Sequence, residues 1–269
     1  MTLMAIVSPH SRYSHQRAGR RSAGCFLRRA FTLVELLIII SILSLLMSIL
    51  VPTLSRSKEL ARRVVCASHI RALISACLTY AGEHRERLPY LHIGNTPSSA
   101  NPSPYWLLRK QVNTEVLTTD EERKACFSFN YNLTREHFYC PSNGPGWNRD
   151  DFWVWPDSTS SVVGYPYFGG NRILSVQGAL RVSYSPVPDR YPVFPMFSSQ
   201  EAAYGVLFAD LTRLQPDGSW FGPDRRGVNH FRNAEPEGQN VGMVDNSVVW
   251  HDWPNYRGFL NNGGWLVHF

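Results

Sequence analysis

A run of 21 residues, Phe31–Val51, carries a single charged side chain, Glu35, and constrains this chain more than any other feature. As a helix the run would be about 31 Å long, which matches the hydrocarbon core of one bilayer. No second run of this kind follows, so the sequence predicts one membrane-spanning helix. A carboxylate near the middle of a bilayer costs roughly 2.5–3.5 kcal/mol, so the presence of Glu35 requires a physical reason.

The charge of the chain is concentrated at one end. The 269 residues have a formal net charge of +6. Six arginines and no acidic residue occur in residues 1–30, at positions Arg12, Arg17, Arg20, Arg21, Arg28 and Arg29. Removing these six from the 27 basic residues leaves 21, which equals the number of acidic residues. The remainder has no excess of positive charge, and we therefore expect no nucleic-acid partner.

Several kinds of N-terminus are compatible with part of this pattern. A secretory signal has a shorter apolar region followed by a small-residue cleavage site, whereas this run ends at Pro52 without one. A lipoprotein could use Cys25, but no apolar region precedes that residue. A twin-arginine signal could use Arg28 and Arg29, but it explains neither Glu35 nor the length. A plain anchor explains the length and leaves the charge unexplained.

The stretch Ala30-Phe31-Thr32-Leu33-Val34-Glu35, followed by Pro52, resembles the prepilin cleavage and methylation motif of type IV pilins and type II secretion pseudopilins. The resemblance implies that a prepilin peptidase cleaves between Ala30 and Phe31 and that Phe31 is N-methylated. Glu35 would then be the fifth residue of the mature chain, as in that family, and Pro52 also occupies a family position. The sequence departs from the family at Ala30, where glycine is usual.

The resemblance also implies a reason for the charge. In the family, this glutamate is thought to pair with the N-terminal amine of the first mature residue, here Phe31, on a neighbouring subunit. A buried carboxylate is tolerated when a cation meets it, and such a pair favours one axial register. Glu35 and Pro52 are therefore the predicted assembly residues. The alternative is a glutamate that snorkels to the interface or is protonated there.

Beyond Pro52 the helix is predicted to continue to about His84. An apolar stripe with helical period predicts a face that packs on a sheet, formed by Cys66, Ile70, Leu73, Ile74, Cys77, Leu78 and Ala81. Leu88-Pro89 then stops the helix. The expected organisation is a leader (1–30), a membrane-spanning helix half (31–52), an amphipathic helix half (53–88) and a head (89–269).

Four cysteines follow the membrane run and would face an oxidising compartment: Cys66, Cys77, Cys126 and Cys140. Cys66 and Cys77 are about 16 Å apart along the helix axis, whereas a disulfide needs Cα atoms within about 7 Å. If all four pair, both bonds join the helix to the segment of Cys126 and Cys140. If one bond forms, Cys126–Cys140 closes the shortest loop. Buried free thiols are the alternative.

Near the C-terminus, Asn240–Val244 and Ser247–His251 predict a hairpin (240–251) about a two-residue turn, Asp245-Asn246. The region resembles the signature of a bacterial group of prepilin-processed proteins called H-X9-DG, with His230 and Asp245 as its named residues. Here 14 residues separate them instead of nine, and Asn246 replaces the glycine. The group's helix cysteine, Leu-Pro and Cys-Pro features have counterparts in Cys66, Leu88-Pro89 and Cys140-Pro141.

No nucleophile, zinc-protease, redox or phosphate-loop motif occurs, so we expect no enzyme. We also expect no metal and no other cofactor. His230 with Asp245 could form a polar cluster or a metal site, although a packed structural histidine is the preferred interpretation. Calcium is the alternative ligand, with oxygens from Asp210, Asp217, Asp224 and Asp245, whose spacing fits no EF-hand. We expect core and edge packing rather than a binding surface for the tryptophans Trp147, Trp153, Trp155, Trp220, Trp250 and Trp253.

These features together predict a pilin-like α+β fold, in which one long N-terminal helix packs on an antiparallel sheet. The implied function is that of a structural subunit of a type IV pilus or type II secretion-type filament. Its expected partners are a prepilin peptidase, other pilin-like subunits and the inner membrane, which it would cross once with its head in the periplasm or at the cell surface. The alternative is a membrane-tethered binding module that reuses a pilin N-terminus.

Overall fold

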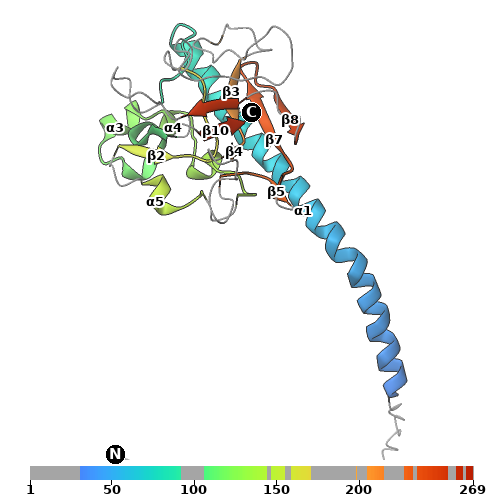
Figure 1. Cartoon of the computed structure of the whole chain (residues 1–269). Helices are drawn as coiled ribbons and strands as arrows, with labels where there is room; N and C mark the ends of the chain where they lie inside the picture. The colour runs from blue at the N-terminus through green and yellow to red at the C-terminus, as the bar shows by residue number, and fades with distance from the viewer. Residues whose placement is uncertain are drawn as a thin grey trace, which may run out of the picture. The chain divides into compact units, whose positions relative to one another are not determined.

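The computed structural model describes residues 31–91, 106–143, 147–154, 159–170, 198, 205–214, 227–232, 235–253, 259–262 and 265–268. The predicted leader, with Ala30, lies outside them. The chain divides into two compact units, Met1–Leu50 and Val51–Phe269. A single long helix, α1 (Leu33–Glu83), belongs to both, and antiparallel sheets follow it (Figure 1). This arrangement confirms the predicted α+β class and is consistent with a pilin-like fold.

The second half of α1 is amphipathic, as the apolar stripe predicts. Its buried residues are Cys66, Ile70, Leu73, Ile74, Ala76, Cys77 and Ala81. This face packs on the sheet of β3 (Val206–Ala209), β7 (Gly238–Met243) and β8 (Val248–Asp252), in the order β3-β7-β8. A Cβ at Gly242 of β7 would lie 2.5 Å from Ile70 Cγ2 and 2.6 Å from Ile74 Cδ1. The helix therefore approaches β7 most closely where the strand has no side chain.

The other elements of the head are short. Three further sheets are described: β1 (Trp106–Leu108) with β2 (Ser160–Val162), β5 (Phe231–Arg232) with β6 (Glu235–Pro236), and β4 (Arg213–Leu214), β10 (Trp265–His268) and β9 (Phe259–Asn262) in the order β4-β10-β9. The short helices are α2 (Arg109–Val112), η1 (Thr114–Val116), α3 (Asp120–Ala125), α4 (Phe127–Asn130), η2 (Arg135–Phe138) and α5 (Asp150–Trp153). Every described strand pair is antiparallel.

The hairpin of β7 and β8 has a longer loop than the sequence predicts. The amide of Asn246 donates to the carbonyl of Met243 at 3.0 Å, and the amide of Met243 donates to the carbonyl of Ser247 at 2.9 Å. The loop therefore has three residues, Val244–Asn246, and the prediction of a two-residue turn is wrong. Asn246 alone among them has a positive φ, 68°. Asp245 instead accepts a hydrogen bond from the Ser247 amide at 2.9 Å, which suits a turn followed by one left-handed residue.

Candidate functional site

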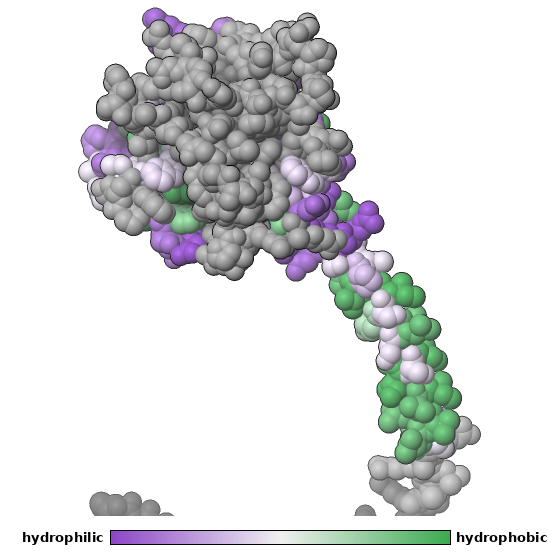
Figure 2. Space-filling model, viewed as in Figure 1, coloured by the Kyte–Doolittle hydropathy of each residue, from purple (hydrophilic) through white to green (hydrophobic). Residues whose placement is uncertain are grey.

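The first candidate site is the exposed apolar segment at the start of α1. Every side chain from Phe31 to Val51 is exposed, and Figure 2 shows a hydrophobic surface along this part of the helix. Among the described residues, α1 is the one helix long and apolar enough to cross a membrane. Apolar area of this extent is unfavourable in water and marks a surface that lipid or protein covers. The segment fits a single-pass membrane anchor.

Glu35 has a local role that the sequence analysis missed. Its Oε2 accepts hydrogen bonds from the Thr32 amide at 2.9 Å and from the Thr32 hydroxyl at 2.8 Å. The amide of Glu35 donates to Thr32 Oγ1 at 3.2 Å. Thr32 and Glu35 thus form a capping box, which satisfies amides that the first helical turn leaves without partners. The signal was present in the sequence as threonine followed three residues later by glutamate.

The second candidate site is a buried polar cluster inside the unit Val51–Phe269. Four side chains from distant segments converge there: Cys66 of α1, Cys140 after η2, Asp210 directly after β3, and His230 directly before β5. Their sulfur, oxygen and nitrogen atoms all lie within 4.8 Å of one another. None of the four residues is more than 3 % exposed. We call this set the Cys–Asp–His cluster.

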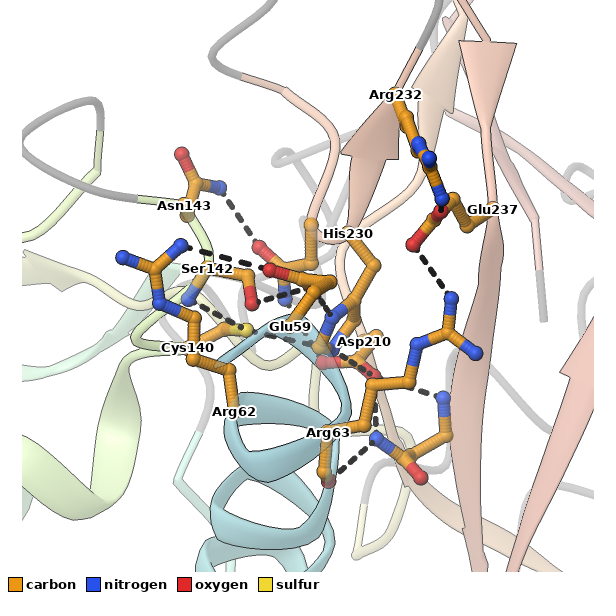
Figure 3. A network of polar contacts seen from close by, with 12 residues as sticks. Glu59, Arg62, Arg63, Cys140, Ser142, Asn143, Asp210, His230, Arg232 and Glu237 are labelled. Carbon is orange, nitrogen blue, oxygen red and sulfur yellow. Dashed lines mark hydrogen bonds and ion pairs between the residues drawn. The ribbon is translucent and has the colours of Figure 1, made fainter. Parts of the chain in front are cut away.

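His230 lies between Glu59 and Asp210 (Figure 3). Its Nδ1 lies 2.7 Å from Glu59 Oε1, and its Nε2 lies 3.2 Å from Asp210 Oδ2 and 3.5 Å from Cys140 Sγ. The ring meets Trp250 edge-on, with centroids 5.1 Å apart. The backbone of His230 is left-handed, with φ of 52°, a conformation that non-glycine residues adopt at some cost. The ring is therefore oriented by contacts of both nitrogens and by the edge-on contact with Trp250.

Asp210 is held by Asn240 of β7 and by Asn229, which lies shortly before β5. Its Oδ2 accepts from the Asn240 amide at 2.7 Å and from Asn240 Nδ2 at 2.9 Å, and its Oδ1 accepts from Asn229 Nδ2 at 2.9 Å. Asn229 also accepts from Asn143 Nδ2 at 2.7 Å. The position of this carboxylate is therefore set by hydrogen bonds as well as by packing, since a buried carboxylate needs such partners.

The charges of the cluster depend on one another. Burial disfavours a charged His230, but the carboxylate of Asp210, with smaller contributions from Cys66 and Glu59, raises the pKa of His230 to about 12. Burial likewise opposes ionisation of Asp210, but the cationic ring lowers the pKa of that carboxyl below its usual range. Burial raises the pKa of the Cys140 thiol well above its ordinary value. Burial also opposes ionisation of Cys66, yet the hydrogen bond with Cys140 lowers the pKa of that thiol.

All four cysteines after the membrane segment are free thiols in this structure. Cys66 and Cys140 meet in the cluster. Cys77 is fully buried, and burial raises its pKa. Cys126 is also buried, and its Sγ donates to the Gln111 carbonyl at 3.3 Å. The disulfide pairings that the sequence allows remain predictions.

The structure separates His230 from Asp245, the two residues of the C-terminal signature. His230 is buried in the cluster, whereas Asp245 is exposed in the hairpin loop. Two of the alternative calcium ligands are separated in the same way, since Asp210 is buried in the cluster and Asp245 is exposed in the hairpin loop. Asp217 and Asp224 lie outside the described residues. Sequence reasoning grouped His230 with Asp245, whereas its neighbours in the structure are Asp210 and Glu59, and Glu59 was missed entirely.

Of the tryptophans that the structure describes, Trp147 and Trp153 belong to the core, as predicted, whereas Trp250 and Trp253 are only half-buried. Trp147 and Trp153 are 2 % and 1 % exposed. Trp155 and Trp220 lie outside the described residues.

A cavity of 490 Å³ near the end of α1 is lined mainly by tyrosines and polar groups: Tyr80, Glu83, His84, Pro89, Tyr90, Leu91, Gln111, Lys124, Ala125, Phe127, Asn130 and Tyr131. No tryptophan contributes to its lining.

Comparison with known proteins bears on the first site. Residues 26–51 match the prokaryotic N-terminal methylation motif. The chain therefore carries a prepilin-type methylation motif at its N-terminal end. This prepilin-type motif supports a pilin-like or pseudopilin-like protein that a peptidase processes and that is associated with a membrane. No curated protein and no solved structure matches the chain. The match ends before the head, so the H-X9-DG signature stays a prediction.

Proposed function

We propose that this chain is a structural subunit of a type IV pilus or type II secretion-type filament. A prepilin peptidase removes residues 1–30, the helix then anchors the protein in the inner membrane, and the head lies outside the cytoplasm. Assembly with other pilin-like subunits covers the apolar helix. The observation that supports this proposal best is Glu35, placed within a methylation motif and on a fully exposed apolar segment. This role requires no catalysis.

The capping box does not remove the cost of the charge. Both hydrogen bonds to the side chain of Glu35 use Oε2, which leaves Oε1 available to a second subunit. Two neutral donors stabilise a carboxylate but do not balance its charge, and in hydrocarbon the imbalance is expensive. The amine of Phe31 on a neighbour, freed by cleavage, supplies the missing cation. Glu35 therefore begins its own helix and also sets the register between subunits.

The two roles of Glu35 can be separated by substitution. Glutamine at this position keeps the capping box, since that motif accepts either residue, and it removes the charge. We expect Glu35→Gln to insert and to be cleaved normally but to lose crosslinking between subunits and recovery in sheared filaments. Glu35→Ala should show the same assembly defect. Thr32→Ala is the matched control, because it weakens the cap and keeps the charge, and it should assemble.

A Glu35→Gln protein that assembles as well as the wild type would contradict the proposal, because capping alone would then explain the residue. The alternative function, a membrane-tethered binding module, makes a different prediction for the same experiment. It predicts no crosslinked form of the wild type at native expression and no phenotype for either Glu35 variant. Membrane levels and the mature mass must be measured in each strain, so that a processing defect is not mistaken for an assembly defect.

A further inference from the structure

We propose that Cys66, Cys140, Asp210 and His230 bind one zinc ion inside the head. This site is distinct from the assembly segment, and the proposed filament role does not require it. It also differs from the sequence-based expectation, which was no metal, with a site at His230 and Asp245, or calcium bound by Asp210, Asp217, Asp224 and Asp245, as the alternatives.

The geometry is close to that of a zinc tetrahedron. With Zn–S bonds of about 2.3 Å and Zn–N or Zn–O bonds of about 2.0 Å, tetrahedral ligand atoms are about 3.3–3.8 Å apart. His230 Nε2 lies 3.2 Å from Asp210 Oδ2 and 3.5 Å from Cys140 Sγ. All four donor atoms lie within 4.8 Å of one another. Small rotations of side chains bring the set to bonding geometry, without movement of the strands.

The donor types select the metal. Two sulfurs, one imidazole nitrogen and one carboxylate oxygen form a set of intermediate softness, which suits zinc and not calcium or magnesium, whose ligands are oxygens. Four protein ligands fill a tetrahedral shell, and a closed shell is typical of structural zinc rather than catalytic zinc. The site is fully buried, which also excludes water from the metal.

Groups around the cluster already orient the ligands. Glu59 Oε1 lies 2.7 Å from His230 Nδ1, so the carboxylate accepts the Nδ1 proton and leaves Nε2 to face the other three ligands. A carboxylate–histidine–metal arrangement of this kind is usual in zinc sites. Glu59 is held in turn by the Ser142 hydroxyl at 2.7 Å and by Arg62 at 3.5 Å (Figure 3). Asp210 is fixed by Asn229 and Asn240.

Binding is an exchange of protons for metal and involves no oxidation. The two thiols and the Nε2 position of His230 each release one proton, and Asp210 already binds as a carboxylate. Because the ligands come from α1 and from three separate segments of the head, one ion joins the helix to the sheet. The proposed role of the metal is to fasten the head onto the helix that carries it.

The test uses the full-length protein, extracted from membranes in mild detergent without chelator or reductant. Elemental analysis should find one zinc per chain. Alkylation followed by mass spectrometry should find Cys66 and Cys140 as thiols that react only after a chelator removes the metal. Cys140→Ser and His230→Gln should reduce the zinc content to near zero. Cys77→Ala is the matched control, because Cys77 is another buried cysteine of α1 outside the cluster, and it should keep the zinc.

A measurement on the wild type keeps the test decisive if the variants fold poorly. The protein is stripped with a chelator under reducing conditions and titrated with Co²⁺, which should give the thiolate charge-transfer and strong visible bands of a tetrahedral site at one equivalent. Absence of both zinc and a cobalt spectrum would overturn the proposal. A Cys66–Cys140 disulfide in peptides from unreduced protein would overturn it too, because the bond consumes two ligands.

Discussion

Two residues with left-handed backbones, His230 and Asn246, shape the C-terminal part of the head. At His230 the conformation turns the chain so that the ring points between Glu59 and Asp210 while the His230 carbonyl accepts from the Glu237 amide at 2.7 Å. At Asn246 it closes the hairpin loop. Both residue types tolerate this conformation better than most, which is why neither site requires glycine.

At the residue scale, the loop of the hairpin gives a first prediction. Asn246→Gly should leave the free energy of unfolding nearly unchanged, because glycine reaches a φ of 68° freely but loses the hydrogen bond from Asn246 Nδ2 to Ser75 Oγ. Asn246→Val should reduce it by about 1 kcal/mol or more, since a branched side chain resists that conformation. Denaturant titration of the full-length protein in detergent measures both. Equal stability of the valine and asparagine proteins would show that the loop does not require a left-handed residue.

At the scale of elements, the contact between α1 and β7 determines how the head is attached to its helix. The stripe on α1 places Ile70 and Ile74 against Gly242, and Arg63 of the same helix pairs with Glu237 and covers the Trp250 ring at 4.1 Å. Apolar packing therefore supplies the contact in the middle of the interface, and a charged contact lies nearer the membrane segment. A side chain added at Gly242 should lower the stability of the head, because protein interiors have few voids that could accommodate it.

Gly242→Ala should therefore reduce the free energy of unfolding by about 1–3 kcal/mol, as overpacking does elsewhere. Adding Ile74→Val, which deletes the Cδ1 atom 2.6 Å from the new methyl group, should recover part of the loss. Gly82→Ala is the matched control, because nothing lies within 4 Å of a Cβ at that helical position, and alanine there should be neutral or stabilising. If Gly242→Ala and Gly82→Ala behave alike, the close approach of α1 to β7 does not exist in solution.

At the scale of the whole molecule, the two units require different surroundings to be stable. The described part of the unit Met1–Leu50 has no buried side chain of its own, whereas the unit Val51–Phe269 contains the core. The exposed apolar surface of the first is unfavourable in water and requires cover by lipid or protein. Under the proposed function, cleavage of the leader is the step that converts an inserted precursor into an assembly-competent chain.

The corresponding prediction concerns the mature N-terminus. Intact mass spectrometry of protein from membranes should show the loss of residues 1–30 and the addition of one methyl group on Phe31. Ala30→Gly should not reduce cleavage, because glycine is the usual residue before the cleaved bond in the family that the motif resembles. A membrane-bound chain that still begins at Met1 would contradict processing, and with it the pairing of Glu35 with a free amine.

Local patterns in the sequence were sufficient to predict several elements of this molecule. The length of the apolar run, the helical period of the stripe from Cys66 to Ala81 and the strand-like arms on either side of Asp245-Asn246 each predict an element, because each reflects contacts of a residue with near neighbours along one helix or strand. The capping role of Glu35 was readable in the same way, from the spacing of Thr32 and Glu35. The prepilin-type N-terminus is a local pattern as well.

The Cys–Asp–His cluster was decided by the tertiary structure alone. Cys66, Cys140, Asp210 and His230 are separated by 20 to more than 70 residues, and no spacing rule connects them. The four side chains come together because α1 packs on β7 and because the segments after η2 and β3 lie beside that contact. This is a property of the tertiary packing and cannot be read from any one segment. The sequence by itself therefore determined the membrane helix and its cap, and the packing of helix on sheet determined which buried polar groups come together.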